Sequence, residues 1–226
     1  FENLLASYNP ETQQTARKQT GSFYTPREIV QYMVDESLVT HLKRTVGNEL
    51  ESEYRKLLDY ADNEILLTEQ QKLAIMQSLY NCKILDPACG SGAFPVGVLQ
   101  QMVHILKQID PDNSRWKNML LQFAIDETSE AYLNSTAEER REAVADIERA
   151  FDENVNYPDY ARKLHLIENC IYGVDIQPIA IQISKLRFFI SLVIDQKRNN
   201  NPADNFGIRP LPNLEAKFVA ANSLLG

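Results

Sequence analysis

The chain has 226 residues, of which 44% are hydrophobic and 24% charged, and its formal net charge is -8. This composition is typical of a soluble globular protein of one or two domains, and it excludes collagen-like, disordered and disulfide-scaffold classes. The most apolar stretch, from Ile179 to Ile194, contains Gln182, Lys185 and Arg187, so it predicts no membrane helix. The acidic balance argues against strong nucleic-acid binding by this chain alone, because Lys and Arg must neutralise phosphates.

The three cysteines, Cys82, Cys89 and Cys170, include no CxxC pair. This pattern predicts neither a disulfide framework nor a zinc site, and it favours a reducing, cytoplasmic location. The chain starts at Phe1 rather than Met, and no secretory signal peptide follows. We therefore expect a piece of a longer polypeptide, whose oligomeric state the sequence does not indicate.

Residues 1–81 are predicted to be a mostly helical N-terminal segment that begins with a polar arm. Thr25 is predicted to cap a helix, with Pro26 at its first position and Glu28 three residues after the cap. Apolar residues then recur at helical spacing at Ile29, Met33, Val34, Leu38, Tyr54, Leu57, Leu58, Leu73, Ile75, Met76 and Leu79. Thr68 and Gln71 stand in capping-box register before the last of these helical patterns.

Residues 82–226 are predicted to be a ligand-binding α/β domain that starts with a strand, a glycine loop and a helix. The apolar run 82–86 ends in Asp86, the sequence Pro-Ala-Cys-Gly-Ser-Gly follows at 87–92, and a helical pattern continues to Leu106.

A second strand, 170–175, also ends in a carboxylate, Asp175, and Pro178 is placed to open the next helix. A third strand is expected at 216–221. Strands separated by helices predict a parallel, doubly wound α/β sheet, whose ligands bind at the carboxyl ends of the strands.

The first crossover is longer than a βαβ unit of ~30 residues requires. Its extra residues, about 110–168, contain apolar residues at helical spacing around Trp116 and a charged amphipathic pattern over 138–151. We therefore expect a helical insertion in this crossover.

The residues at the expected strand ends suit a ligand that joins an amino acid to a nucleoside. A glycine loop and a helix N-terminus can bind a carboxylate, and Asp86 can hold an ammonium. Asp175 can accept hydrogen bonds from both hydroxyls of a ribose. A dinucleotide is disfavoured, because Pro95 replaces the third glycine of that fingerprint and no suitable acid ends a strand ~20 residues later.

Three motifs resemble the S-adenosyl-L-methionine-dependent DNA amino-methyltransferases. They are Gly-Ser-Phe-Tyr-Thr-Pro at 21–26, Asp-Pro-Ala-Cys-Gly-Ser-Gly at 86–92 and Tyr-Gly-Val-Asp-Ile-Gln-Pro at 172–178. The stretch 160–194 more narrowly resembles the Eco57I-type methylase domain of fused type II restriction-modification enzymes. The resemblance implies a Rossmann-like methyltransferase sheet and a role in adenine methylation.

The resemblance also implies which residues bind the cofactor. Thr25 and the backbone around Phe23 and Tyr24 would line the methionine end of S-adenosyl-L-methionine. The implied cradle for its amino-acid part consists of Asp86, Ala88, Gly90 and Gly92. Asp175 would hold the ribose, Ile176 would pack on the adenine, and Asn222 stands where the family usually has an Asp that contacts the adenine amino group.

The family's catalytic Asn/Asp-Pro-Pro-Tyr/Phe motif does not occur in the sequence. We therefore expect cofactor binding without turnover, no catalytic residue in this chain, and double-stranded DNA bound by regions of the parent enzyme outside it. Three alternatives remain open: the modification subunit of a multi-subunit restriction system, a cytosine amino-methyltransferase, and a non-catalytic ligand-sensing module.

Several of these residues also have ordinary structural explanations. Thr25 could act only as a helix cap, and Asp175 could cap the helix that Pro178 opens. Cys89 lies in the loop without a nearby histidine, which favours packing over a nucleophilic role. The histidines, His41, His104 and His165, are isolated in the sequence and are expected to be structural or exposed.

Overall fold

The computed structural model describes residues 8–9, 14–15, 25–126, 135–210 and 212–224. Phe23 and Tyr24, expected to line the cofactor, lie outside the described residues. Two short strands, β1 (Tyr8–Asn9) and β2 (Gln14–Thr15), pair antiparallel.

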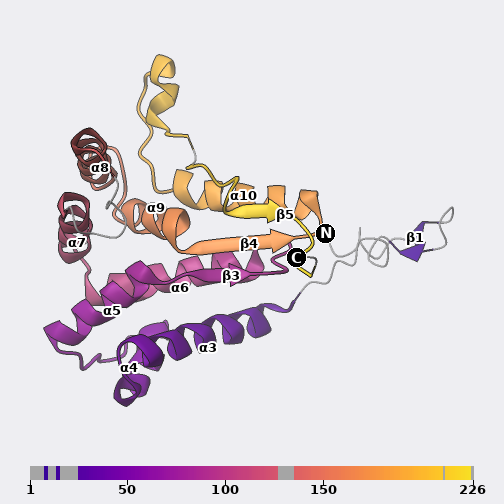
Figure 1. The fold of residues 1–226 in the computed structure, drawn as a ribbon, viewed down its shortest axis with the longest axis horizontal. Coiled ribbons are helices and arrows are strands. Elements are labelled where there is room, and N and C mark those ends of the chain that lie inside the picture. The colour runs from indigo at the N-terminus through magenta and orange to yellow at the C-terminus, as the bar shows by residue number, and fades with distance from the viewer. Residues whose placement is uncertain (1–7, 10–13, 16–24, 127–134, 211, 225–226) are drawn as a thin grey trace.

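The central sheet has three parallel strands in the order β3-β4-β5. They are β3 (Ile84–Asp86), β4 (Ile171–Asp175) and β5 (Phe218–Ala220). In the register, Asp86 is opposite Gly173, and Asp175 is opposite Ala220. All three strands therefore end at the same edge of the sheet, where the arrowheads lie in Figure 1.

Helices make up most of the described chain. The α-helices are α3 (Arg27–Thr45), α4 (Glu51–Leu58), α5 (Glu69–Asn81), α6 (Ala93–Ile109), α7 (Ser114–Ile125), α8 (Ala137–Ala150), α9 (Asp159–Asn169) and α10 (Pro178–Val193). Two 3₁₀ helices span Asn48–Leu50 and Pro202–Gly207. In the described part of the chain, no helix combines the length and the apolar character needed to cross a membrane.

The N-terminal helices pack on α6 through a continuous apolar core. Gly97 of α6 permits close approach of α3, because a Cβ at this position would lie 3.1 Å from Val34 Cγ2. The predicted capping box at the start of α5 is confirmed, since Thr68 Oγ1 accepts from the Gln71 amide and the Gln71 side chain accepts from the Thr68 amide.

The predicted cap of α3 is wrong by one residue. The N-cap is Pro26, which has an extended backbone (φ -54°, ψ 147°), and its carbonyl accepts from the Val30 amide at 3.1 Å. No side chain caps this helix. Thr25 lies one position too early, so its hydroxyl does not cap the first turn.

The long crossover between β3 and β4 contains α7, α8 and α9, as the helical pattern of residues 110–168 predicted. Trp116 and Met119 of α7 are buried, whereas α8 is half-buried along its apolar side. The last of the three helices, α9, packs against α6 and leads directly into β4. These helices lie at the end of the sheet remote from the arrowheads (Figure 1).

One face of the sheet is covered by helices. In Figure 1, α6 and α10 lie behind the strands, and Phe188 of α10 packs on Phe218 of β5 with ring centroids 4.8 Å apart. On the other face, the side chains of Leu85 and Val219 are 61% and 40% exposed. The described residues thus form a mostly helical α/β unit with a small parallel sheet, and the expected doubly wound sheet, with helices on both faces, is not established.

Candidate functional site

The glycine loop turns sharply at the carboxyl end of β3. Gly90 (φ 53°) and Gly92 (φ 81°) both adopt the left-handed conformation that favours glycine. A Cβ on Gly90 would meet nothing within 4 Å, so the space beside this residue is open. Gly92 is the N-cap of α6, a helix whose first amides have no partner within the helix. The loop therefore combines open space with backbone donors and the positive end of a helix dipole.

Hydrogen bonds join this loop to both neighbouring strand ends. The Ala88 amide donates to Asp86 Oδ1 at 3.1 Å, and the Cys89 amide donates to the Val174 carbonyl at 2.9 Å. The Gly90 amide donates to Asp175 Oδ2 at 2.8 Å. The two carboxylates predicted from the sequence thus lie on either side of one loop.

Asp175 has a structural role at the start of α10. Its Oδ1 accepts from the Gln177 amide at 2.8 Å, while its Oδ2 accepts from Gly90. The alternative that Asp175 caps α10 is not borne out, because Gln177 is the N-cap, no side chain caps the helix, and at this helix Asp175 accepts from the amide of the N-cap residue itself. Each carboxylate oxygen has a further lone pair, so these bonds leave Asp175 able to accept from a ligand.

The site has a negative electrostatic character. Burial raises the pKa of the Asp86 carboxyl, and the negative charge of nearby Asp175 raises it further, against the lowering effect of the Ala88 amide. Burial also raises the pKa of the Cys89 thiol to about 11, with Asp86 and Asp175 adding to the shift. Cys89 is therefore a protonated, buried packing residue at neutral pH, as expected, and a cationic ligand would relieve the repulsion between the two carboxylates.

The other predicted site residues occupy different positions. Ile176 follows Asp175 and is 63% exposed. Asn222 lies just after β5, where its Oδ1 accepts from the Leu224 amide and the preceding Ala221 amide donates to the Asp175 carbonyl. Thr25 is exposed before α3, and in the described ranges no hydrogen bond or ion pair joins it to the loop.

Two residues that the sequence analysis missed also contact the loop. Ser184 Oγ donates to the Gly90 carbonyl at 3.0 Å, and Arg187 Nη1 donates to the Ser91 carbonyl at 3.0 Å. Both belong to α10. A signal was present, because Ser184 shares a helical face with the apolar residues Ile181 and Phe188, where a polar side chain needs a partner.

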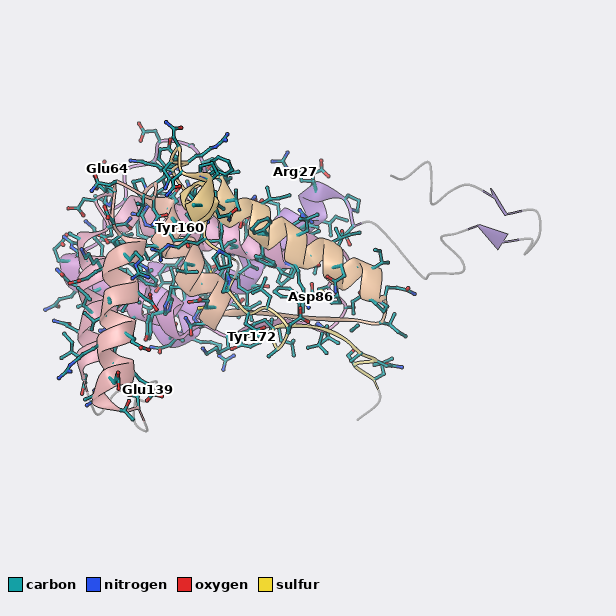
Figure 2. All side chains as sticks on the ribbon, turned by 90° about the horizontal axis from the view of Figure 1, so that it is seen from above. Arg27, Glu64, Asp86, Glu139, Tyr160 and Tyr172 are labelled. Carbon is teal, nitrogen blue, oxygen red and sulfur yellow. The ribbon has the colours of Figure 1, made fainter. Side chains whose placement is uncertain are left out.

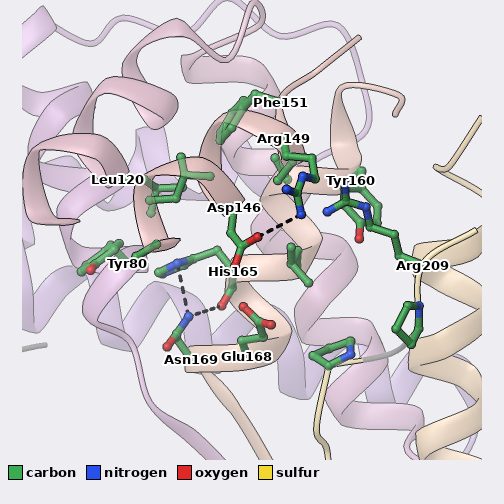
Figure 3. A pocket seen from close by; sticks show the side chains of 17 residues that line it. Tyr80, Leu120, Asp146, Arg149, Phe151, Tyr160, His165, Glu168, Asn169 and Arg209 are labelled. Carbon is green, nitrogen blue, oxygen red and sulfur yellow. Dashed lines mark hydrogen bonds and ion pairs between the residues drawn. The ribbon is translucent and has the colours of Figure 1, made fainter. Parts of the chain in front are cut away.

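A separate cavity of about 670 Å³ lies between α8, α9 and the segment that contains Arg209, Pro210 and Pro212 (Figure 3). Arg149, His165, Glu168 and Arg209 line it together with apolar side chains. Burial lowers the pKa of His165 to about 4 and raises the pKa of Glu168. None of the cofactor-site residues predicted from the sequence lines this cavity.

The two regions lie far apart in the molecule. Figure 2 shows Asp86 toward the carboxyl ends of the strands and Tyr160, which lines the cavity, toward the opposite end of the sheet. In the described residues, no cluster of three His, Cys, Asp or Glu side chains could hold a metal ion. The strand-end site thus consists of glycines, backbone amides and two carboxylates.

Comparison with curated proteins finds a similar protein in Methanocaldococcus jannaschii, named "Putative type II restriction enzyme and methyltransferase". The two are 27% identical over 222 residues, which cover 93% of this chain. The chain spans 15% of the length of that relative. No protein-family model matches the chain, and no solved structure matches it.

Proposed function

We propose that the chain is the cofactor-binding part of an S-adenosyl-L-methionine-dependent DNA methyltransferase from a restriction-modification enzyme. The observation that carries this proposal is the placement of Asp86 and Asp175 on either side of a glycine loop with open space beside Gly90. The similarity to a protein named as a restriction enzyme and methyltransferase supports the same class.

The residues present fit this cofactor. S-adenosyl-L-methionine carries a carboxylate, an ammonium and a sulfonium, and it supplies an activated methyl group. The Ser91 amide and the N-terminus of α6 would bind the carboxylate, and Asp86 would hold the ammonium. Asp175 would accept from the ribose hydroxyls, and the exposed side chain of Ile176 would cover one side of the adenine.

Four further residues are assigned more peripheral contacts with the cofactor. Phe23, Tyr24 and Thr25 would contact its methionine end. Asn222 would accept from the adenine amino group through its Oδ1, because an amide oxygen can replace a carboxylate as acceptor. In this division, residues 1–81 would be an N-terminal segment whose helices pack on α6, and residues 82–226 would be the binding domain.

For the reaction, we propose methyl transfer to the exocyclic amino group of adenine in duplex DNA, after the base is rotated out of the stack. The present chain would position the cofactor, and regions beyond it would bind DNA and orient the amino group. Because the sequence lacks an Asn/Asp-Pro-Pro-aromatic motif, the chain alone is expected to bind cofactor without transferring methyl groups.

Isothermal titration calorimetry with S-adenosylhomocysteine tests the proposal directly. We expect saturable binding at one site, and we expect Asp175→Ala to weaken it by about tenfold to a hundredfold, because a ligand hydrogen bond to a charged group contributes about 1.5–3 kcal/mol. Asp195→Ala, which changes a carboxylate just beyond the C-terminal end of α10, is the matched control. Absence of binding by the folded chain would refute the proposal.

A further inference from the structure

We infer that Ser184 and Arg187 of α10 are positioning residues for the cofactor, because they fix the orientation of the glycine loop. The inference rests on the proposed function and deepens it. Both side chains donate hydrogen bonds from α10 to carbonyl groups of the loop. Neither is assigned a direct contact with the ligand.

Ser184 lies directly beneath the loop. It is fully buried, and its Oγ donates to the Gly90 carbonyl at 3.0 Å. A Cβ on Gly92 would lie 2.8 Å from Ser184 Oγ and 3.2 Å from Ser184 Cβ, so the loop backbone and this side chain are in close contact. The loop therefore has little freedom to rotate while Ser184 is in place.

The orientation of one peptide group connects Ser184 to the ligand. The C=O and N–H groups of a trans peptide point in opposite directions, and the described residues contain no cis peptide bond. Because the Gly90 carbonyl points toward α10, the Ser91 amide in the same peptide group points away from α10. Ser184 thus presents the Ser91 N–H toward the open side of the loop, where a ligand carboxylate would bind.

Arg187 restrains the following peptide group. Its Nη1 donates to the Ser91 carbonyl at 3.0 Å, and the Gly92 amide of that same peptide group donates to the Cys89 carbonyl at 2.8 Å. The guanidinium also brings a positive charge to the loop, which favours an anionic group beside it. Two consecutive peptide groups are thereby held by α10.

Two ligands can distinguish a residue that positions the loop for the cofactor from a residue that only stabilises the fold. S-adenosylhomocysteine carries the amino-acid part of the cofactor, whereas 5'-methylthioadenosine has the same nucleoside without the amino and carboxyl groups. We expect Ser184→Ala to weaken binding of S-adenosylhomocysteine by about fivefold to tenfold, the effect of one lost orienting hydrogen bond, and to leave binding of methylthioadenosine within about twofold.

Two further variants complete the test. Arg187→Gln, which changes a less buried side chain, should show the same ligand selectivity if Ser184→Ala fails to fold. Ser191→Ala is the matched control, because Ser191 Oγ donates to the Phe188 carbonyl within α10 and does not contact the loop. It should change the affinity for neither ligand.

The outcomes separate this inference from the proposed function. If the wild-type chain binds both ligands and the variants weaken both equally or neither, the positioning role is refuted and the proposed function stands. If the folded wild-type chain binds neither ligand, both are refuted. Selective loss of S-adenosylhomocysteine binding supports the positioning role.

Discussion

Asp86 illustrates how a residue proposed to bind a ligand can reduce the stability of the fold. The pKa of its carboxyl is raised in the folded state, mainly by burial and further by Asp175. Ionisation above this raised pKa therefore costs folding free energy, whereas the cost is absent at low pH, where the carboxyl is protonated in both states. A half-buried negative charge of this kind is expected where a cationic ligand binds.

Asp86→Asn is therefore expected to raise the free energy of unfolding at about pH 7, and this gain should disappear as the pH falls toward about 4. The asparagine oxygen can still accept from the Ala88 amide, so the loop keeps its first hydrogen bond. Urea denaturation across this pH range measures the effect. Asp112→Asn is a control that should instead lower the free energy of unfolding at about pH 7, because the Ser114 amide and hydroxyl lower the pKa of Asp112. A variant at Asp86 that is less stable than wild type at neutral pH would contradict the argument.

At the scale of the element, α10 has two apolar faces. Ile181, Phe188 and Leu192 are buried against the rest of the chain. A second stripe at helical spacing, formed by Ile179, Leu186 and Ile190, is 51–67% exposed. Exposed stripes of this kind favour association with other apolar surfaces.

Replacement of both Leu186 and Ile190 by Gln is expected to change the free energy of unfolding by less than about 1 kcal/mol, because about half of each side chain is already in contact with water. The same variant should bind less of a hydrophobic dye and aggregate less. The buried replacement Leu192→Gln provides the contrast, with an expected loss of about 2–5 kcal/mol. Equal destabilisation by the exposed and buried changes would show that the stripe is packed.

The sequence predicted the strands, the loop and the carboxylates of the site better than the long-range contacts that hold them in place. Glycines, prolines and strand-end carboxylates are local signals, so β3, the glycine loop and Asp175 could be located by position. The bond from Ser184 to Gly90 joins residues 94 positions apart, so the helical pattern indicates that Ser184 needs a partner but does not indicate which one. The start of α3 was misplaced because Thr25 and Pro26 both suit a helix start, and only the backbone conformation distinguishes them.

At the scale of the whole molecule, acidic residues outnumber basic ones by 31 to 23, which gives the net charge of -8. The described strand-end site is also acidic through Asp86 and Asp175. Because duplex DNA repels such a surface, the regions that bind DNA in the proposed parent enzyme are expected to lie elsewhere.

The chain alone is expected to bind a short fluorescent DNA duplex no more tightly than a Kd of about 10⁻⁴ M at physiological salt, the weak end of non-specific binding. Fluorescence anisotropy measures this, and cofactor binding by the same preparation shows that the protein is folded. Saturable binding in the micromolar range would contradict the expectation and would indicate a basic surface that the overall charge conceals.

The hydrogen bonds that shape the glycine loop also determine when it can form. They join residues that are 85, 94 and 96 positions apart, through Asp175 to Gly90, Ser184 to Gly90 and Arg187 to Ser91. Such contacts require closure of long chain loops and therefore form slowly compared with local helices. During synthesis, the helices from α3 to α6 can assemble while the loop still lacks its partners. The glycine loop is thus among the last parts of the fold to mature, and the proposed cofactor site is complete only after α10 has emerged and docked.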